Sequence, residues 1–426
     1  MNQPYRNRKL TGAAEAIARI PRLEQFIVGL LAATPLLAAV HFRWIDFVIP
    51  VAFVTLLSMA ATSARYQRAI QRQWMLDWRN PLTLFAVASA GWMALSVLWA
   101  PNVHRAAFAA LQAAAIVCGA LSVAVAVKAV PRERVFSLLV KFVFAAILIA
   151  TLASIGVIII QRAGLQAPLA GDIRGAAPKL ILFVWPALGW LAEKRRSRDF
   201  WLLLGLSVLL IVVSRSGAAG LALIGAAAVI AIGQLLPRLA VVGPLLLLLL
   251  AFIAAPFLNQ LGFVLHWPHV SNYLARFEAD QRIDIWTFYG SLFWQHPWSG
   301  LGFRAERFFD ASLFPPSIPA EAHLHPHNEP LQVLLEFGIV GAALLLAALA
   351  FAARALWRAG RPQAVYVAAC VAAFLLEGLV NFSLWESWWL AVVAIAFVFC
   401  GRLLDKPEFT APARASPSPS ASAATP

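Results

Sequence analysis

Charged residues are scarce in this sequence: they make up 13% of its 426 residues, whereas 61% are hydrophobic. A composition this apolar argues against a soluble globular protein and is typical of integral membrane proteins. Lysine and arginine outnumber aspartate and glutamate by 34 to 20, which gives a net charge of +14. The basic residues form short clusters between apolar segments instead of one long run, so we expect membrane segments and no nucleic-acid partner.

Cysteine is nearly absent, with three residues in the whole chain: Cys118, Cys370 and Cys400. All three fall within apolar segments, and no motif spacing links them. We therefore expect small, buried, hydrophobic side chains, and we expect neither a disulfide framework nor a cysteine metal site. The chain also lacks an evident internal repeat.

Apolar segments near the roughly 20 residues that a bilayer requires recur along the chain. The sequence predicts twelve of them, at about 25–40, 45–62, 81–99, 106–127, 135–160, 176–193, 199–213, 217–236, 240–258, 330–353, 363–380 and 384–404. The first resembles the apolar part of a signal peptide, but a second span follows after a short turn, so we expect a retained helix. The predicted fold class is an all-α integral membrane protein with about 12 transmembrane helices.

The positions of lysine and arginine predict the orientation of these helices. With the N-terminus inside, the inner connecting segments hold more than twice as many basic residues as the outer ones, so we expect both termini to be cytoplasmic. Four regions follow: helices 1–9 within residues 1–258, an outward-facing loop at 259–329, helices 10–12 at 330–404 and a tail at 405–426. The tail is rich in proline, serine and alanine, and we expect it to be disordered.

The segment 259–329 is the one long connection between predicted spans. It carries Trp267, Trp286, Trp294 and Trp298 and many phenylalanine and proline residues. This apolar content is atypical of a flexible linker and favours short helices that lie on the bilayer surface and cover a cavity.

A polar run with three histidines, His323, His325 and His327, ends this segment, and an apolar helix follows it. Asn328 is a good N-cap, and a glutamate and a proline in the next two positions suit a first turn. The apolar spacing then predicts one continuous helix, with Gly338 and Gly341 on one face. Two glycines on one face would let another helix approach closely.

These residues carry a resemblance to a known family. His327-Asn328, nine further residues and then Gly338-Ile339-Val340-Gly341 fit the signature H-[N/S/Q]-x9-G-x-x-G. This resembles the O-antigen ligase and Wzy polymerase superfamily of bacterial membrane glycosyltransferases, and the run HPWSGLGF at 296–303 is similar to that family's segment before the signature.

The resemblance implies a GT-C-like fold and an O-antigen ligase activity. Such an enzyme transfers O-antigen polysaccharide from undecaprenyl diphosphate to a sugar of lipid A–core, which completes lipopolysaccharide. The implied reaction is inverting, needs no cofactor or metal ion, and takes place at the periplasmic face of the bacterial inner membrane. The implied partners are the undecaprenyl diphosphate-linked glycan, the lipid A–core acceptor and the surrounding lipids.

Basic residues on the predicted outer face are candidates for binding the donor diphosphate, because guanidinium groups match phosphate oxygens two at a time. The candidates are Arg174, Lys179, Arg215 and Arg282. A lone arginine near a membrane can instead reach a lipid phosphate without further function. The resemblance implies the diphosphate role for Arg215, Arg282 and Arg174. Ligases often show Arg-x3-Leu at the first site, whereas Ala219 stands at that spacing here.

Three interpretations of His327 follow from the residues. It could be a general base that takes a proton from an acceptor hydroxyl, since its reference pKa of about 6.5 lies near working pH and arginines nearby would keep it neutral. It could bind a metal ion with His323 and His325, which share its face in an extended segment. It could also simply orient the loop. The resemblance favours the base and implies no metal.

Three further charged residues are candidates for a role. Glu377 and Lys141 lie within predicted spans, where ionisable residues are costly and frequently functional. Glu386 lies on the predicted outer side, where it could orient the acceptor or be an ordinary interfacial glutamate.

The sequence leaves alternatives open. An O-antigen polymerase and a protein O-oligosaccharyltransferase share the donor and the signature. A polysaccharide or lipid transporter or flippase would suit twelve spans, but the lack of a repeated half and the polar residues on one outer face count against it.

Overall fold

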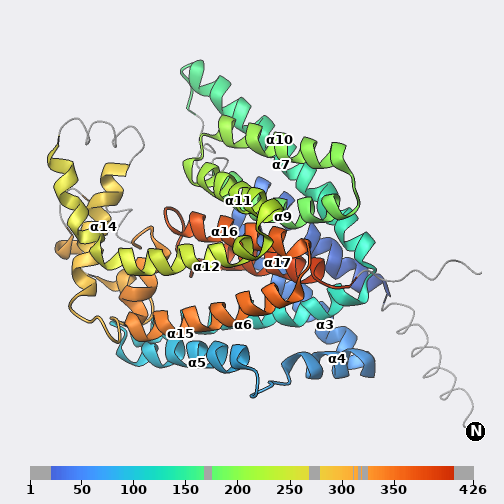
Figure 1. Ribbon diagram of the computed structural model, residues 1–426, viewed down its shortest axis with the longest axis horizontal. Coiled ribbons are helices and arrows are strands. Elements are labelled where there is room, and N and C mark those ends of the chain that lie inside the picture. The colour runs from blue at the N-terminus through green and yellow to red at the C-terminus, as the bar shows by residue number, and fades with distance from the viewer. Residues whose placement is uncertain are drawn as a thin grey trace, which may run out of the picture.

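The computed structural model describes residues 21–166, 175–267, 279–309, 311–314, 318 and 325–406. Within these ranges the chain is helical and has no strand (Figure 1). Eight of the described helices are long and apolar enough to cross a membrane, or nine if the bent pair Pro21–Ala32 and Thr34–Val40 forms one span. The protein is therefore a multi-pass membrane protein.

The elements follow one another closely, with short connections. In chain order after the helix Pro21–Ala32 they are α2 (Thr34–Val40), η1 (Phe42–Phe47), α3 (Val48–Thr62), α4 (Ala64–Trp74), α5 (Pro81–Ser96), η2 (Val97–Trp99), α6 (Val103–Ala129), α7 (Arg132–Arg162), α9 (Ala176–Glu193), α10 (Ser197–Ser214), α11 (Gly217–Leu235), α12 (Pro237–Ala254), η3 (Ala255–His266), α14 (Ala279–Phe293), η4 (Ala305–Phe308), η5 (Ala311–Leu313), α15 (Glu329–Ala359), α16 (Gln363–Gly378) and α17 (Ser387–Leu403).

Each of the twelve predicted apolar segments corresponds to a helix or a bent pair of helices in the structure. The helices α16 and α17 are apolar but shorter than the eight long ones, and α9 is not among those eight, so the count of twelve crossings stays a prediction. The helix α4 was not predicted, because residues 63–80 are too polar to read as a span. It carries Arg65, Arg68 and Arg72 and packs on the bundle through Tyr66, which is buried.

The helix α9 forms the centre of the larger of two hydrophobic cores. Its residues from Ala176 to Leu191 are all buried, and all but Lys179 among them are uncharged. The helices α7, α10, α11, α16 and α17 surround it. Small residues bring two of these neighbours together: on α11, Gly225 abuts Leu376 of α16, and Gly233 abuts Val365. These contacts show that α11 and α16 run antiparallel.

The cysteine prediction holds for two of three residues. Cys370 and Cys400 are buried thiols in this core, but Cys118 is exposed on the outer surface of α6. We expected Cys118 to be buried because the sequence around it is apolar. An apolar membrane helix can also present such a residue to the surrounding lipid, and Cys118 lies on such a surface.

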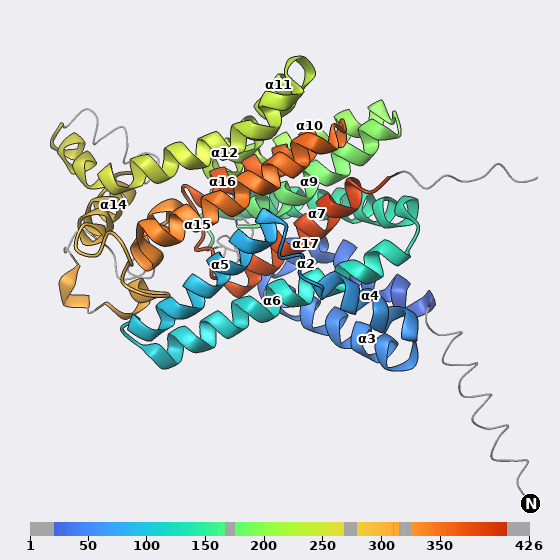
Figure 2. The ribbon, with the colours of Figure 1, turned by 60° about the horizontal axis from the view of Figure 1, so that its bottom comes forward.

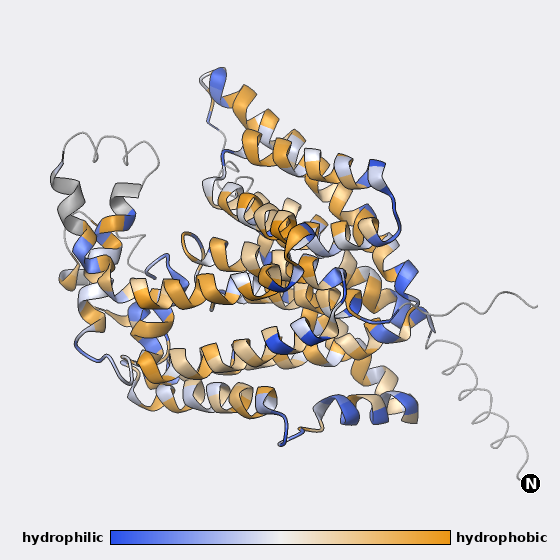
Figure 3. Ribbon diagram, in the orientation of Figure 1, coloured by the Kyte–Doolittle hydropathy of each residue, from blue (hydrophilic) through white to orange (hydrophobic). Residues whose placement is uncertain are grey.

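The second core lies where α5 and α15 run side by side and α14 packs against the start of α15 (Figure 1). It forms one end of the bundle, which we call the histidine end because His327 precedes α15 there. The helices α3 and α4 lie at the opposite end (Figure 2). Hydrophobic residues cover the lengths of the helices, while hydrophilic residues gather at helix ends and on α4 (Figure 3).

Candidate functional site

The ring of His327 is held by the turn that follows α16. Its Nδ1 lies 2.8 Å from the backbone carbonyl oxygen of Asn381. Because a carbonyl oxygen can only accept a hydrogen bond, Nδ1 carries the proton and donates it. The Nε2 atom of the neutral ring therefore keeps a lone pair, which is the form that a general base requires.

The carbonyl that holds His327 is itself anchored by a buried carboxyl group. The amide Nδ2 of Asn381 donates to Oε2 of Glu377 at 2.9 Å, and Glu377 is fully buried. Glu329 lies beside this group against Gly378, and Trp389 Nε1 donates to its Oε1 at 3.4 Å. Glu377, which the sequence left without a partner, thus fixes the turn that orients His327. Lys141, the other intramembrane candidate, is exposed on α7.

Asn328 is confirmed as the N-cap of α15. Its Oδ1 accepts from the backbone N–H of Leu331 at 2.9 Å, and its Nδ2 donates to the carbonyl of Leu379 at 3.3 Å. Glu329 and Pro330 occupy the first turn, as predicted. The residue before the cap, His327, has a left-handed backbone with φ of 48°. The cap and the turn after α16 therefore position the backbone of His327 as well as its ring.

His325 supports the same loop from the other side. Its Nδ1 accepts from the backbone N–H of His327 at 3.1 Å, and the two rings lie 3.9 Å apart. Burial, together with charge repulsion from His327, Arg307 and Arg304, lowers the pKa of His325 to about 2. His325 is therefore neutral at physiological pH. His323 lies outside the described residues.

Arg282 lies on α14, the helix that docks against the histidine loop. Trp286, one turn further along α14, donates from Nε1 to the carbonyl of Pro326 at 3.0 Å and so fixes this helix to the histidine loop. Burial lowers the pKa of His327, the hydrogen bond to Asn381 opposes this shift, and the positive charge of Arg282 adds to it. The structure thus brings Arg282 within electrostatic reach of His327, and both effects keep His327 neutral.

The prediction that one continuous helix follows His327 is wrong. The backbone of Gly338, with φ of 65° and ψ of −170°, is not helical and breaks α15. The break leaves the carbonyls of Leu335 and Glu336 and the N–H groups of Ile339 and Val340 without their usual helical partners. Membrane interiors tolerate such a break only where other groups satisfy the backbone.

The run HPWSGLGF supplies those groups. Leu301 N–H donates to the carbonyl of Leu335 at 2.7 Å, and Gly302 N–H donates to that of Glu336 at 3.0 Å. In return, Ile339 N–H donates to the carbonyl of Pro297 at 2.8 Å, and Val340 N–H donates to that of Trp298 at 3.3 Å. Each of the two opened helical bonds is therefore replaced by a pair of bonds to the segment 297–302.

The glycines of the signature have different roles in this arrangement. A Cβ atom on Gly338 would lie 2.2 Å from the carbonyl oxygen of Trp298, so this glycine admits a backbone segment and not the predicted second helix. A Cβ atom on Gly300 would likewise lie 2.4 Å from the carbonyl carbon of Glu336. Gly341 does face another helix: its open side receives Trp92 of α5, whose Nε1 donates to the carbonyl of Phe337 at 2.9 Å.

A buried polar cluster below this break was missed from the sequence. Gln332 Nε2 lies 2.8 Å from Glu336 Oε1, 2.9 Å from Ser383 Oγ and 3.2 Å from Glu306 Oε1. Trp385 Nε1 donates to Glu336 Oε2 at 2.8 Å. Burial raises the pKa of Glu306, and a hydrogen bond links its carboxyl group to that of Glu336. The spacing of Gln332 and Glu336, four residues apart in an apolar helix, was the available signal.

Two arginines were also missed as candidates. Arg304 and Arg307 both pair with Glu386: Nη2 of Arg304 lies 3.3 Å from Oε1, and Arg307 Nη2 bonds to the same oxygen. Glu386 therefore ties the segment after HPWSGLGF to the start of α17. Since both arginines act on the pKa of His325, they belong to the electrostatic surroundings of the site.

Arg215 lies at the same end of the bundle, on a different element. It ends α10 in a left-handed conformation, with φ of 53°, and it is exposed. Its neighbour Ser216 caps α11 by accepting from Ala219 N–H at 3.4 Å. Because α11 runs antiparallel to α16, its first turn lies toward the end of α16 that leads to Asn381.

Lys179 has surroundings other than those expected for a diphosphate ligand. It is 3% exposed, its Nζ donates to the carbonyl of Gly175 at 2.7 Å, and it lies within 6 Å of the rings of Phe42, Phe382 and Trp388. Its ammonium group is thus enclosed by protein, where aromatic faces favour a cation. Arg174 lies outside the described residues.

The metal interpretation of His327 involves His323, which lies outside the described residues, so the structure does not test it. Among the described residues, no three histidine, cysteine, aspartate or glutamate side chains are placed to hold a metal ion together. The described part of the site supplies a neutral, oriented imidazole, a nearby guanidinium and a second exposed arginine at the same end.

Comparison with known proteins agrees with the resemblance. A family model described as O-Antigen ligase matches residues 200–346, which include Arg215, Arg282, His327 and Gly338. A Rickettsia bellii protein named "Putative polysaccharide ligase" is 26% identical over 141 residues, and a protein of the same kind from Rickettsia typhi is 28% identical over 144 residues. Each alignment covers 30% of this chain and 33% of the relative, so the chain spans about a third of the length of these relatives.

Proposed function

Since residues 200–346 carry the O-antigen ligase family match and include His327, Arg282 and Arg215, we propose that the protein is an O-antigen ligase. It transfers O-antigen polysaccharide from undecaprenyl diphosphate to a sugar of lipid A–core. The observation that carries the proposal is the hydrogen bond from His327 Nδ1 to the Asn381 carbonyl, because it leaves Nε2 free to accept a proton.

The proposed reaction uses one base and two cations. Nε2 of His327 takes the proton of the acceptor hydroxyl, and the hydroxyl oxygen attacks the anomeric carbon of the donor sugar. The bond from that carbon to the diphosphate oxygen breaks, and undecaprenyl diphosphate leaves with its electron pair. Arg282 and Arg215 bind the diphosphate and stabilise its growing negative charge. Attack opposite the leaving group inverts the anomeric configuration.

The remaining site residues have supporting roles in this proposal. Arg174, which directly precedes the cap of α9, is retained as a further diphosphate ligand. Lys179 acts indirectly, because its enclosed ammonium group influences the buried carboxyl of Glu377. Glu386 positions Arg304 and Arg307 beside the acceptor, and His325 holds the loop of His327.

The proposed location follows from the distribution of basic residues. The histidine end faces the periplasm, both termini are cytoplasmic, and the protein resides in the bacterial inner membrane. Donor and acceptor are both anchored in the outer leaflet of that membrane, so a site at the histidine end can reach both.

The test is a reconstituted transfer assay. Purified protein is mixed with undecaprenyl diphosphate-linked polymer and lipid A–core, and attached polymer is measured on gels. We expect wild-type protein to attach polymer and His327→Ala to lose about 10²- to 10⁴-fold in rate, the usual contribution of a general base. His104→Ala, at an exposed position on α6, is the matched control.

The outcomes also separate the related activities. Normal attachment by a folded His327→Ala protein would refute the base. Polymer growth on the donor without attachment to lipid A–core would identify a polymerase. Transfer to a protein instead would identify a protein O-oligosaccharyltransferase, and movement of intact donor across vesicles without transfer would identify a flippase.

A further inference from the structure

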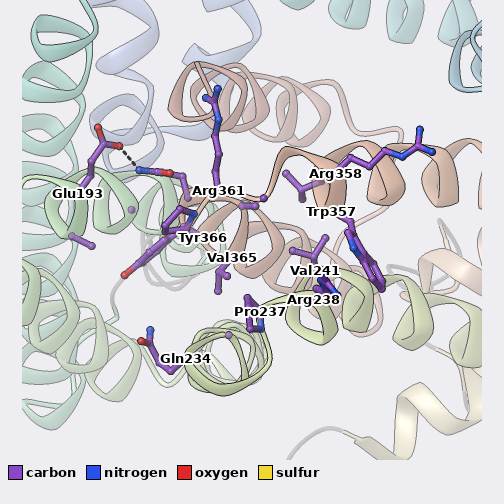
Figure 4. Close-up of a pocket in the computed structure, with 18 residues that line it drawn as sticks. Glu193, Gln234, Pro237, Arg238, Val241, Trp357, Arg358, Arg361, Val365 and Tyr366 are labelled. Carbon is purple, nitrogen blue, oxygen red and sulfur yellow. Dashed lines mark hydrogen bonds between the residues drawn. The ribbon is translucent and has the colours of Figure 1, made fainter. Parts of the chain in front are cut away.

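A cavity of about 990 Å³ lies among α9, α11, α12, α15 and α16 (Figure 4). It is at the end of the bundle opposite the histidine end. The helix α15 begins beside His327 and ends at Ala359, next to this cavity. At about 1.5 Å per residue, the two sites are roughly 40 Å apart. The cavity is therefore separate from the proposed transfer site.

The described lining of this cavity is positively charged. It includes three arginines, Arg238, Arg358 and Arg361, and one carboxylate, Glu193. Figure 4 shows Glu193 on one side, Trp357 and Arg358 on the other, and Arg361 between them. The guanidinium group of Arg238 lies 5.9 Å from the ring of Trp357.

The carboxylate in the lining does not neutralise these arginines, because other partners already hold it. Arg132 donates to Glu193 with Nη1 at 2.5 Å and with Nη2 at 2.7 Å, and Gln363 Nε2 donates at 2.7 Å. Arg361 donates to the carbonyl of Leu404, which fixes the turn but adds no negative charge. The cavity thus keeps a surplus of positive charge that favours an anion.

An apolar cleft of about 600 Å³ lies next to this cavity, between α12, α15 and α16. The two spaces share Val241 and Leu356 in their linings. The remaining lining of the cleft is apolar and includes Pro244 and Phe374. A cationic cavity beside an apolar cleft matches a molecule with an anionic head and a hydrocarbon chain. The cavity alone would fit any anion, and the cleft alone would fit any apolar group.

The surroundings place this pair of spaces at a membrane interface. Leu235 and Leu236, at the turn between α11 and α12, are 83% and 56% exposed. Trp357, at the end of α15, is 44% exposed. Exposed leucine and tryptophan beside arginine at helix ends are typical of the boundary between lipid chains and headgroups.

We propose that this cavity binds the phosphate headgroup of an anionic glycerophospholipid, with one acyl chain in the adjoining cleft. Arg238 and Arg358 hold the phosphate, and Val241 and Leu356, which line both spaces, lie where the headgroup meets the acyl chain. A free phosphate ion shares the headgroup chemistry but would leave the cleft unused, so the two sources are separable by experiment.

The test measures lipids that remain bound to the full-length protein. Detergent-purified protein is exchanged with phosphatidylglycerol or phosphatidylcholine, and retained lipid is counted by native mass spectrometry. We expect phosphatidylglycerol to be retained in preference, and Arg358→Gln and Arg238→Gln each to weaken its retention roughly tenfold, as loss of a charged hydrogen bond would. Arg354→Gln, one turn earlier on α15 and absent from the lining, is the matched control.

A second pair of variants tests the cleft. Leu356→Trp and Val241→Phe place larger side chains where the linings of the two spaces meet. They should reduce the retention of phosphatidylglycerol without changing the binding of inorganic phosphate. Thermal melting of each variant checks that it folds. Equal retention of both lipids, or unchanged retention in the arginine variants, would overturn the proposal. Displacement of lipid by millimolar inorganic phosphate, with no effect of the cleft variants, would identify a site for free anions instead.

Discussion

The ring of His327 and the carbonyl of Asn381, 54 positions apart in the chain, meet at 2.8 Å. This single contact selects the tautomer of the histidine and directs its second nitrogen away from the turn that holds it. Because Asn381 is anchored on Glu377, the orientation of the proposed base depends on a buried carboxyl group that never touches a substrate.

Removing that carboxyl group should slow transfer without weakening substrate binding. We expect Glu377→Leu to lower kcat about tenfold with little change in KM, because Asn381 loses its anchor and the imidazole loses its alignment. Glu377→Gln keeps an acceptor for the Asn381 amide and should restore most of the rate. Steady-state assays over a donor series provide the measurement. A rise in KM as the main effect would contradict this role.

The pH profile should show a base with a lowered pKa. Burial and the charge of Arg282 lower the pKa of His327 below 6.5, so the neutral form persists as pH falls through 6.5. The rate should therefore begin to decline at a lower pH than it would with an ordinary histidine as the base. Arg282→Gln removes a positive charge that disfavours protonated His327, so the pKa of His327 should rise and the acid limb should move to higher pH. The maximal rate should also fall, because the diphosphate loses a ligand. Arg105→Gln serves as the control. If the acid limb of Arg282→Gln did not move, Arg282 and His327 would not be close enough to interact.

Gly338 should tolerate no side chain. We expect Gly338→Ala to destabilise the protein by several kcal/mol, because its φ is positive and a Cβ atom would meet the backbone of Trp298 and Gly300. Gly243→Ala, where a Cβ atom meets nothing within 4 Å, is the control and should be close to neutral. The melting temperatures of the two variants in detergent, each compared with that of the wild type, provide the measurement. Equal melting temperatures would show that the break in α15 is not required.

Gln332 should matter to stability through its three buried partners. Gln332→Leu removes the donor that Glu306, Glu336 and Ser383 share. Each buried polar group left without a hydrogen bond lowers the free energy of unfolding by about 1–3 kcal/mol. We expect a melting temperature lower by several degrees. Gln112→Leu, at an exposed position on α6, should change it little. Comparable melting of both variants would mean that the cluster contributes no net stability.

Local patterns in the sequence predicted the parts of the site that local chemistry decides. The apolar periodicity gave the helices, and the residues around Asn328 gave the start of α15, because a cap involves only its own first turn. The signature led to His327 and Gly338. The basic helix α4 escaped notice because its polarity hides its amphipathic packing.

The break in α15 could not be predicted from the local sequence, because a distant segment causes it. The residues around Gly338 read as helix, and only the docking of the run HPWSGLGF opens their hydrogen bonds. The pairing of Arg304 and Arg307 with Glu386 likewise depends on which loops meet, and no spacing in the chain records it. Arg282 was predicted as a candidate, but its approach to His327 depends on how Trp286 docks α14.

The exchanged backbone bonds at Gly338 bear on how the chain is assembled. A newly made α15 would enter lipid with two carbonyls and two N–H groups unsatisfied, each costing several kcal/mol in hydrocarbon. The segment 297–302, already synthesised by then, must dock at once. Biogenesis therefore couples the segment 297–302 to the break in α15, so a chain in which this docking fails should be recognised as misfolded and degraded.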